Sequence, residues 1–148
     1  NSEQADILDL LSGHTDDTTI ERLAFECLLT NMTDDRVVSL MNILGWQGDF
    51  NCFAIGGVPS AMFASSILAI RKAVRDLGGE HVVIGTYGTF LLAWLANGRV
   101  TPEVTVTAVM PAFSEDEPLY LSPVRSGVAG ASHALRETSS RCRRLRRC

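Results

Sequence analysis

The stretch that decides the fold is HVVIGTYGTFLLAWL, residues 81–95. Two apolar runs rich in β-branched and aromatic residues flank the glycines at 85 and 88, which predicts a buried β-hairpin that turns at residues 85–88. No Asp, Glu, Lys or Arg lies between His81 and Leu95. A hairpin that handles nucleotide phosphates and metal ions needs carboxylates or cations. The stretch therefore indicates a scaffold like that of a nucleotide enzyme, without the charged residues of its chemistry.

Helices are predicted on both sides of the hairpin, because apolar residues recur there at helical spacing. Thr18 and Glu21 have the spacing of a capping box at the start of a helix over 17–32. The most regular pattern begins at Pro59 or Ser60 and ends at Leu77. For residues 102–113 the alternation VTVTAV also fits a strand. A helix is favoured, because Pro102 suits the first position of a helix and the chain needs a return connection here. The remaining predicted helices cover residues 5–12, 33–44 and about 128–138.

Two further strands are predicted, at 50–55 and 119–124. Gly56-Gly57 is expected to turn the chain after the first, and Pro123 places the second at or near a sheet edge. After residue 45 the order is β-α-β-β-α-β-α, in which a hairpin lies between two βα units. The expected fold is therefore α+β, a ferredoxin-like βαββαβ sandwich preceded by N-terminal helices. Right-handed crossovers would place the helices on one face of the sheet.

The composition is that of one globular domain. The 148 residues are 46% hydrophobic and 20% charged, and no apolar run reaches the roughly 18 residues that span a bilayer. The N-terminus is polar and acidic, unlike a signal peptide, so a cytoplasmic protein is expected. Residues 1–140 hold 8 basic and 17 acidic residues, a net charge of −9. This acidic body argues against a nucleic-acid surface within the domain.

The four cysteines and three histidines form no metal-ligating pattern. No CxxC pair is present, and His14, His81 and His133 stand apart, so no metal site is expected. Cys27 lies on an apolar helical stripe and Cys52 lies within a strand. Both positions predict buried thiols in a reducing compartment.

The order of these segments resembles that of a known family. The segments are ILGW at 43–46, FNCFAI at 50–55, the long amphipathic helix, the Gly-Tyr-Gly hairpin and LYLSPVRSGVAGASHAL at 119–135. Over about residues 36–140 the chain resembles the GGDEF-like regulatory domain of PucR/CdaR-type bacterial transcription regulators. The resemblance implies a fragment of a longer regulator, which binds DNA through a C-terminal helix-turn-helix domain that this chain lacks.

The resemblance extends to diguanylate cyclases, which share this fold and are active enzymes. Their signature is Gly-Gly-Asp/Glu-Glu-Phe on the central hairpin, with a metal-binding Asp at the end of the first strand. The matching residues here are Thr86, Tyr87, Gly88, Thr89 and Phe90 on the hairpin, and Ala54-Ile55-Gly56-Gly57 at the strand end. None can hold Mg²⁺ ions and a triphosphate. The resemblance thus implies a domain that is not an enzyme, with no catalytic, cofactor-binding or metal-binding residues.

Other candidate sites are better explained by structure than by function. Gly56-Gly57 precedes a helix, but without either phosphate-loop motif. Arg71, Lys72 and Arg75 fit a solvated helix face better than a contact with an anionic effector. His133 lies beside Ser132 without a nucleophile motif, and His81 is expected at a surface or edge. Trp46 and Trp94 could line a ligand pocket, although core packing is preferred.

The last eight residues, RCRRLRRC, hold five of the 13 basic residues of the chain. This Arg-rich tail could bind nucleic acid, extend the last helix, or derive from an expression vector or an altered reading frame. A disordered or vector-derived tail at 141–148 is the preferred interpretation.

We therefore expect three segments: N-terminal helices at 1–45, the GGDEF-like domain at 46–140, and the tail. The leading hypothesis is a non-catalytic regulatory domain that forms a homodimer through its N-terminal helices and acts on the absent DNA-binding domain. Two alternatives stay open. One is a sensor of a small-molecule effector, and the other is a divergent nucleotide-binding or cyclase-like enzyme.

Overall fold

The computed structural model describes residues 19–78, 82–87, 91–97 and 101–147. The predicted helix at 5–12, Thr18, His81 and the hairpin residues 88–90 lie outside these ranges. The described elements are a helix over residues 19–29, α2 (Asp35–Ile43), β1 (Asn51–Gly57), α3 (Phe63–Asp76), β2 (Val82–Tyr87), β3 (Leu91–Asn97), α4 (Pro102–Val109), the 3-10 turn η1 (Met110–Ala112), β4 (Tyr120–Leu121), β5 (Arg125–Ser126) and α5 (Gly127–Arg147).

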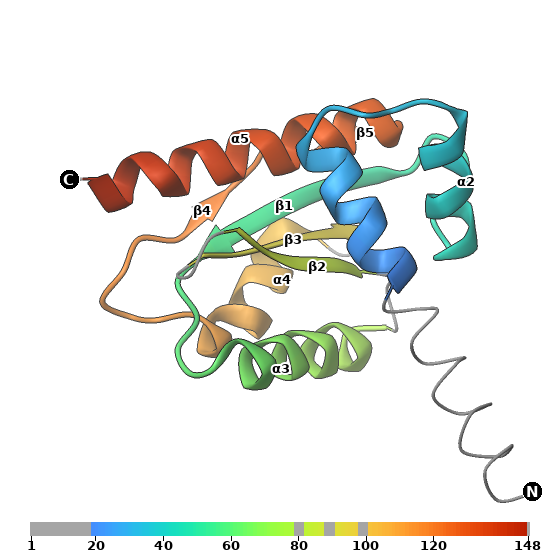
Figure 1. Cartoon of the computed structure of the whole chain (residues 1–148). Helices are drawn as coiled ribbons and strands as arrows, with labels where there is room; N and C mark the ends of the chain where they lie inside the picture. The colour runs from blue at the N-terminus through green and yellow to red at the C-terminus, as the bar shows by residue number, and fades with distance from the viewer. Residues whose placement is uncertain (1–18, 79–81, 88–90, 98–100, 148) are drawn as a thin grey trace, which may run out of the picture.

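The strands form one antiparallel sheet in the order β2-β3-β1-β4, with β5 also paired to β1. Helices α3 and α4 cover one face, and the helix over 19–29 and α5 cover the other (Figure 1). This strand order is that of the split-βαβ arrangement. The predicted α+β, ferredoxin-like fold is confirmed, and the two crossover helices share one face as expected. The last helix lies on the opposite face.

Strand β1 lies at the centre of both cores. Its side chains alternate, so that Cys52 and Ala54 pack under α5 whereas Phe53 and Ile55 pack over α3 and α4. All six residues from Cys52 to Gly57 are buried. A strand covered by helices on both faces carries apolar residues without polar alternation, as the sequence predicts.

The N-terminal helices belong to the same core as the sheet. Ala24 and Leu28 of the helix over 19–29, with Met41 of α2, pack in one cluster with Ala131 and Leu135 of α5. The Ser132 hydroxyl donates a 2.6 Å hydrogen bond to the carbonyl oxygen of Leu28. The predicted apolar stripes are therefore used within the chain.

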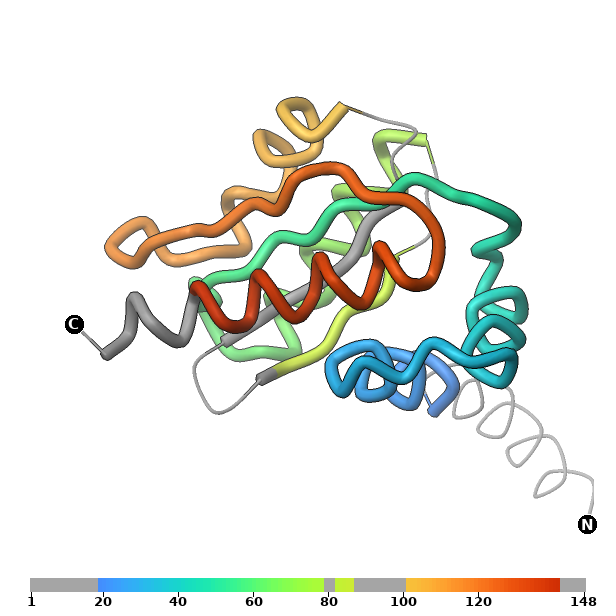
Figure 2. The backbone as a smooth tube through the Cα atoms, turned by 90° about the horizontal axis from the view of Figure 1, so that it is seen from above, coloured from blue at the N-terminus to red at the C-terminus, as the bar shows by residue number. Residues whose placement is uncertain are grey.

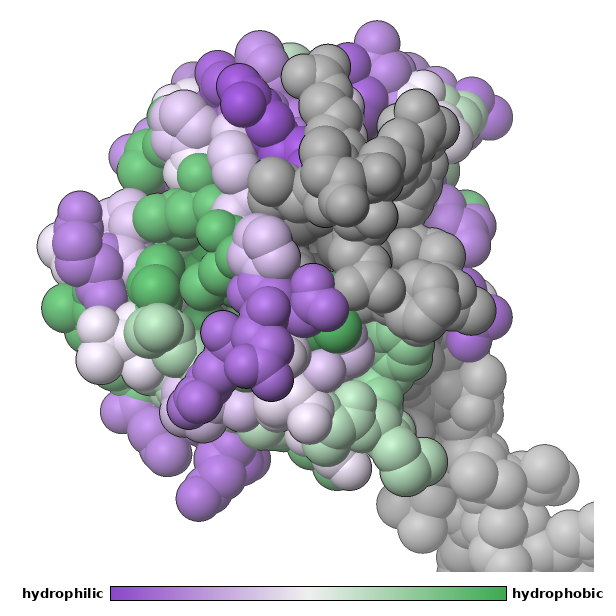
Figure 3. Space-filling model, turned by 90° about the vertical axis from the view of Figure 1, so that its left-hand side faces the viewer, coloured by the Kyte–Doolittle hydropathy of each residue, from purple (hydrophilic) through white to green (hydrophobic). Residues whose placement is uncertain are grey.

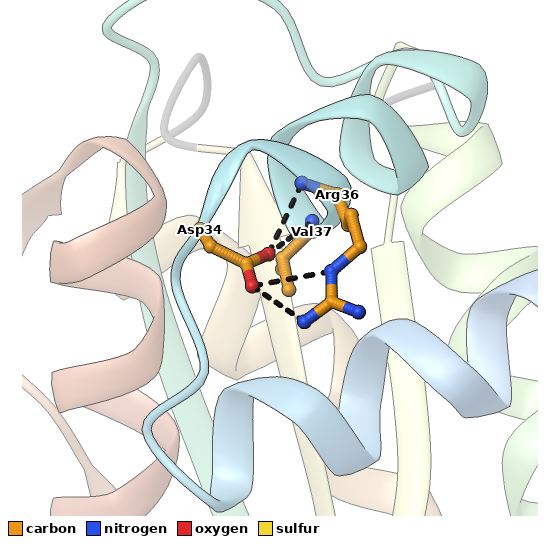
Figure 4. A network of polar contacts seen from close by, with 3 residues as sticks. All are labelled: Asp34, Arg36 and Val37. Carbon is orange, nitrogen blue, oxygen red and sulfur yellow. Dashed lines mark hydrogen bonds and ion pairs between the residues drawn. The ribbon is translucent and has the colours of Figure 1, made fainter.

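The start of α2 is confirmed at its N-cap residue, Asp34 (Figure 4). One carboxylate oxygen accepts the backbone N–H groups of Arg36 and Val37 at 3.1 and 3.3 Å. The other accepts the Arg36 guanidinium at 2.8 Å. These bonds satisfy N–H groups that have no partner inside the helix. They also hold the pKa of Asp34 below its usual value, chiefly through Arg36.

The predicted helix at 102–113 is confirmed for its first part. Thr101 is the N-cap of α4 and accepts the N–H of Val104 at 3.4 Å, with Pro102 at the first helical position. The 3-10 turn η1 follows directly. Proline is favoured at this position because the first turn needs no N–H donor.

Two predicted turns are wrong because the glycines lie inside strands. Residues 85–87 of β2 pair with residues 91–93 of β3, so the chain does not turn at Gly85, Thr86 or Tyr87, and Gly88 lies outside the described residues. Gly56 and Gly57 continue β1 and also pair with β3. A Cβ atom at Gly57 would lie 3.0 Å from the Phe113 ring and 3.1 Å from Leu119. Close packing between layers explains this glycine, and a change of chain direction does not.

The predicted strand at 119–124 is shorter than expected and interrupted. Only Tyr120–Leu121 and Arg125–Ser126 pair with β1. Between them, Ser122 binds the backbone of Ala54 twice, through its N–H and its hydroxyl, both at 2.8 Å. The expected edge position is confirmed for β4, which ends the strand order.

The last helix is longer than predicted. It runs along β1 (Figures 1 and 2). It continues to Arg147. The disorder expected for the tail is therefore wrong for residues 141–147, which extend α5. Arg141, the first of these, lies 5.7 Å from the centre of the Tyr120 ring, a cation–π distance.

We predict that Gly85→Ala destabilises the fold, because the added Cβ atom would overlap the Phe25 ring. Overpacking of this kind costs about 1–3 kcal/mol of unfolding free energy, measured by urea denaturation. Phe25→Leu in the same chain should recover part of the loss. Equal stability of Gly85→Ala and the wild type would contradict this packing.

Candidate functional site

A groove of about 540 Å³ lies where the helix over 19–29, α3 and the edge strand β2 meet. We call it the β2 groove. Both helices contribute residues at i, i+3, i+4 and i+7, the spacing of one helix face. These are Arg22, Phe25, Glu26 and Leu29 on the first helix, and Ala64, Ile67, Leu68 and Arg71 on α3. Ile84, Gly85 and Thr86 of β2 form the third side.

Glu21 joins all three sides of the groove. Its carboxylate accepts two hydrogen bonds from the Arg71 guanidinium, at 3.1 and 2.6 Å. It also accepts the backbone N–H of Ile84 at 3.2 Å. A two-fold contact of this kind fixes the relative position of both partners. It also pairs one N–H on a strand edge that would otherwise face solvent.

The Glu21–Arg71 contact was not predicted from the sequence. The spacing of Glu21 from Thr18 predicts a capping box, and the position of Arg71 predicts a solvated face. The 14% exposed Glu21 side chain instead binds Arg71, 50 residues away along the chain. The solvated face is confirmed for Lys72 and Arg75, which are exposed. A pair so distant in sequence leaves no periodic signal.

Phe25 and Gly85 determine how closely the helix over 19–29 approaches β2. Phe25 is 2% exposed, and its ring occupies the space that a side chain at position 85 would need. Glycine is required here for close approach and not for an unusual backbone conformation.

The positions matched to the cyclase signature hold no charged group in the part of the chain that the structure describes. Thr86 is exposed on β2, Tyr87 ends that strand, and residues 88–90 lie outside the described ranges. At the end of β1, Gly57 packs against Phe113 and Leu119. Within the described ranges, no three His, Cys, Asp or Glu side chains come together as a metal site.

The remaining candidate residues have structural surroundings. Ser132 is buried, donates to Leu28 and accepts the Nε–H of Arg136 at 3.1 Å, whereas His133 is exposed. These two residues therefore form no nucleophile–base pair. Trp46 is 1% exposed and packs edge-on against Phe50 at 5.1 Å, so its predicted core role is confirmed. The Trp94 side chain lies outside the described part.

The two described cysteines differ in burial. Cys52 is fully buried in β1, and this burial raises the pKa of its thiol to about 12. A thiol with so high a pKa has almost no reactive thiolate at neutral pH. Cys27 is half-buried beside the same core, so its predicted burial is only partial.

A second hollow, of about 530 Å³, lies between η1 and the loop before β4. Its surface combines apolar residues with the predicted acidic loop, and no Lys or Arg lines it: the residues are Ser60, Met110, Pro111, Phe113, Ser114, Glu115, Asp116, Glu117 and Leu119. Figure 3 shows this end of the molecule, where hydrophobic and hydrophilic areas adjoin.

No described helix has both the length and the apolar character needed to cross a membrane.

The chain is similar to the protein in the crystal structure of a regulator of polyketide synthase expression from Bifidobacterium adolescentis. The two are 83% identical in sequence, with a TM-score of 0.84, over 88% of this chain. This chain spans 55% of the length of that protein. No protein-family model and no curated protein matches the sequence.

We predict that Glu21 and Arg71 are energetically coupled. Arg71 is 41% exposed, so a double-mutant cycle with Glu21→Gln and Arg71→Met should give only about 0.5–1 kcal/mol in unfolding free energy. Glu21→Gln should also speed hydrogen exchange of the Ile84 amide. Lys72→Met replaces the exposed residue next to Arg71 and is the matched control. It should change neither the unfolding free energy nor the hydrogen exchange of the Ile84 amide. Additive effects of the two substitutions would exclude a stabilising pair.

Proposed function

We propose that this chain is a non-enzymatic regulatory domain of a transcription regulator. The observation that carries the proposal is the 83% identity to the Bifidobacterium regulator across 88% of the chain. Proteins so similar in sequence share their core and most of their surface, so a shared role in regulation is the simplest interpretation. A transcription regulator of this kind would act in the cytoplasm.

The finer proposal is a GGDEF-like domain of the PucR/CdaR type. Three features support it: the strand order β2-β3-β1-β4, a central hairpin without carboxylates, and a β1 end that packs against apolar side chains. DNA would be bound by a helix-turn-helix domain outside this chain. The chain would act on that domain by packing against it. The fold alone does not establish this function, because the same fold can carry different functions.

An exchange of domains tests the regulatory role. We expect the Bifidobacterium regulator to keep its control of a polyketide synthase reporter when its matching segment is replaced by this chain. Deletion of that segment is the control and should abolish the response. A deletion that regulates the reporter as well as the intact protein would refute a regulatory role for this segment.

The enzyme alternative has a separate test within the same proposal. Calorimetry of this chain with GTP and Mg²⁺ should show neither binding heat nor turnover, because the hairpin has no carboxylate to hold the metal ion. Magnesium-dependent binding would favour the cyclase-like alternative.

We further propose that the chain forms a homodimer through its N-terminal helices. Their inward stripes are already buried, but Leu23, Val38 and Ile43 expose 46%, 37% and 64% of their surface. A second copy of the chain packed on these two helices would cover the three side chains.

We predict that the double substitution Val38→Glu with Ile43→Glu weakens the dimer at least about tenfold, because it places charges in an apolar contact. Light scattering at tens of micromolar measures the mass. The matched control is Val104→Glu with Met110→Glu, which replaces two exposed apolar residues of α4 and η1, at 48% and 55% exposure. A wild-type monomer at this concentration would contradict the proposal.

A further inference from the structure

Two side chains of opposite charge lie on one wall of the β2 groove. Arg22 and Glu26 both line the groove, and both are exposed. Within the described ranges, neither side chain forms an ion pair with another residue. They do not pair with each other, although they lie one helical turn apart. Arg four residues before Glu is the less favourable orientation of such a pair. Among the residues that the structure describes, no partner competes with a ligand for these two groups.

The other charges of the groove are already satisfied. Glu21 and Arg71, which also line the groove, bind each other. Their contact leaves Arg22 and Glu26 as the charged groups of the groove that can select a ligand. A guanidinium selects a carboxylate, and a carboxylate selects an ammonium group.

The opposite wall is apolar and partly uncovered. Leu68 of α3 is 67% exposed within the groove, next to the half-buried Ile67. Leu29 extends this surface on the first helix. Pockets for small ligands enclose about 300–1,000 Å³ and combine an apolar lining with a few polar groups. The volume of about 540 Å³ lies in this range.

We infer that the β2 groove binds a free apolar α-amino acid. Its carboxylate pairs with Arg22, its ammonium group pairs with Glu26, and its side chain packs on Leu68 and Ile67. The Cβ atoms of residues one helical turn apart lie about 5–6 Å from each other, so two flexible side chains of opposite charge can each reach one of the two charged groups on the Cα atom of an amino acid. This inference goes beyond the proposed function, because it names a ligand and a binding site. Amino-acid binding can also be measured without a transcription assay.

Calorimetry with the intact chain tests the ligand class. L-leucine and L-phenylalanine are the probes. Glycine lacks the apolar side chain, N-acetyl-leucine lacks the ammonium group, and leucinamide lacks the carboxylate. We expect the two probes to bind and each of these three compounds to bind at least about tenfold more weakly. Absence of binding by both probes at about 10 mM, or equal binding of any of the three compounds, would overturn the inference.

Variants of exposed residues test the site without disturbing the fold. Arg22→Gln, Glu26→Gln and Leu68→Ser should each weaken L-leucine binding at least about tenfold, with unchanged thermal unfolding of the free protein. Lys72→Gln, on α3 but outside the groove, should bind like the wild type. Binding that survives both charge substitutions would place the amino acid elsewhere and refute this site. Either result leaves the reporter experiment above unaffected, so the two proposals fail separately.

Discussion

Burial of β1 on both faces is the constraint on which the rest of the structure depends. Its alternate side chains enter two different cores, one under α3 and α4 and one under α5. Neither core can form without helices on its own side of the sheet. This explains why the N-terminal helices pack into the domain, since they complete the core that α5 covers only in part. The strand therefore sets the three layers and the position of every helix.

The same layering creates the β2 groove. The helix over 19–29 reaches past α5 to the β2 edge, where Glu21 pairs with the Ile84 N–H and with Arg71. An unpaired strand edge invites association with other chains, so a helix laid beside it also protects the fold. The groove is the space left between this helix and α3. The packing of the helix over 19–29 and α3 against the sheet sets the position of the groove. Arg22 and Glu26, which take no part in this packing, would determine which ligand it binds.

A regulatory role rests on similarity to one longer protein, and the fold by itself is compatible with enzymes and with non-enzymes. What the structure adds concerns chemistry. Within the described ranges no cluster of metal ligands is present, and the buried Cys52 and Ser132 have structural surroundings. Of the two hollows described above, the β2 groove combines charged groups of both signs with an apolar wall, whereas the hollow beside η1 is lined by no Lys or Arg.

The sequence by itself determined the order of the elements along the chain, the cap at Asp34 and the core positions of Cys52 and Trp46. Each of these depends on residues close together in the chain, where helical or strand periodicity is visible. Only the tertiary structure decided the role of the glycines, because Gly57 and Gly85 make room for Phe113 and Phe25 from other layers. It also decided the Glu21–Arg71 contact and the groove around it. Contacts across 50 residues arise from packing of whole elements, and local pattern carries no trace of them.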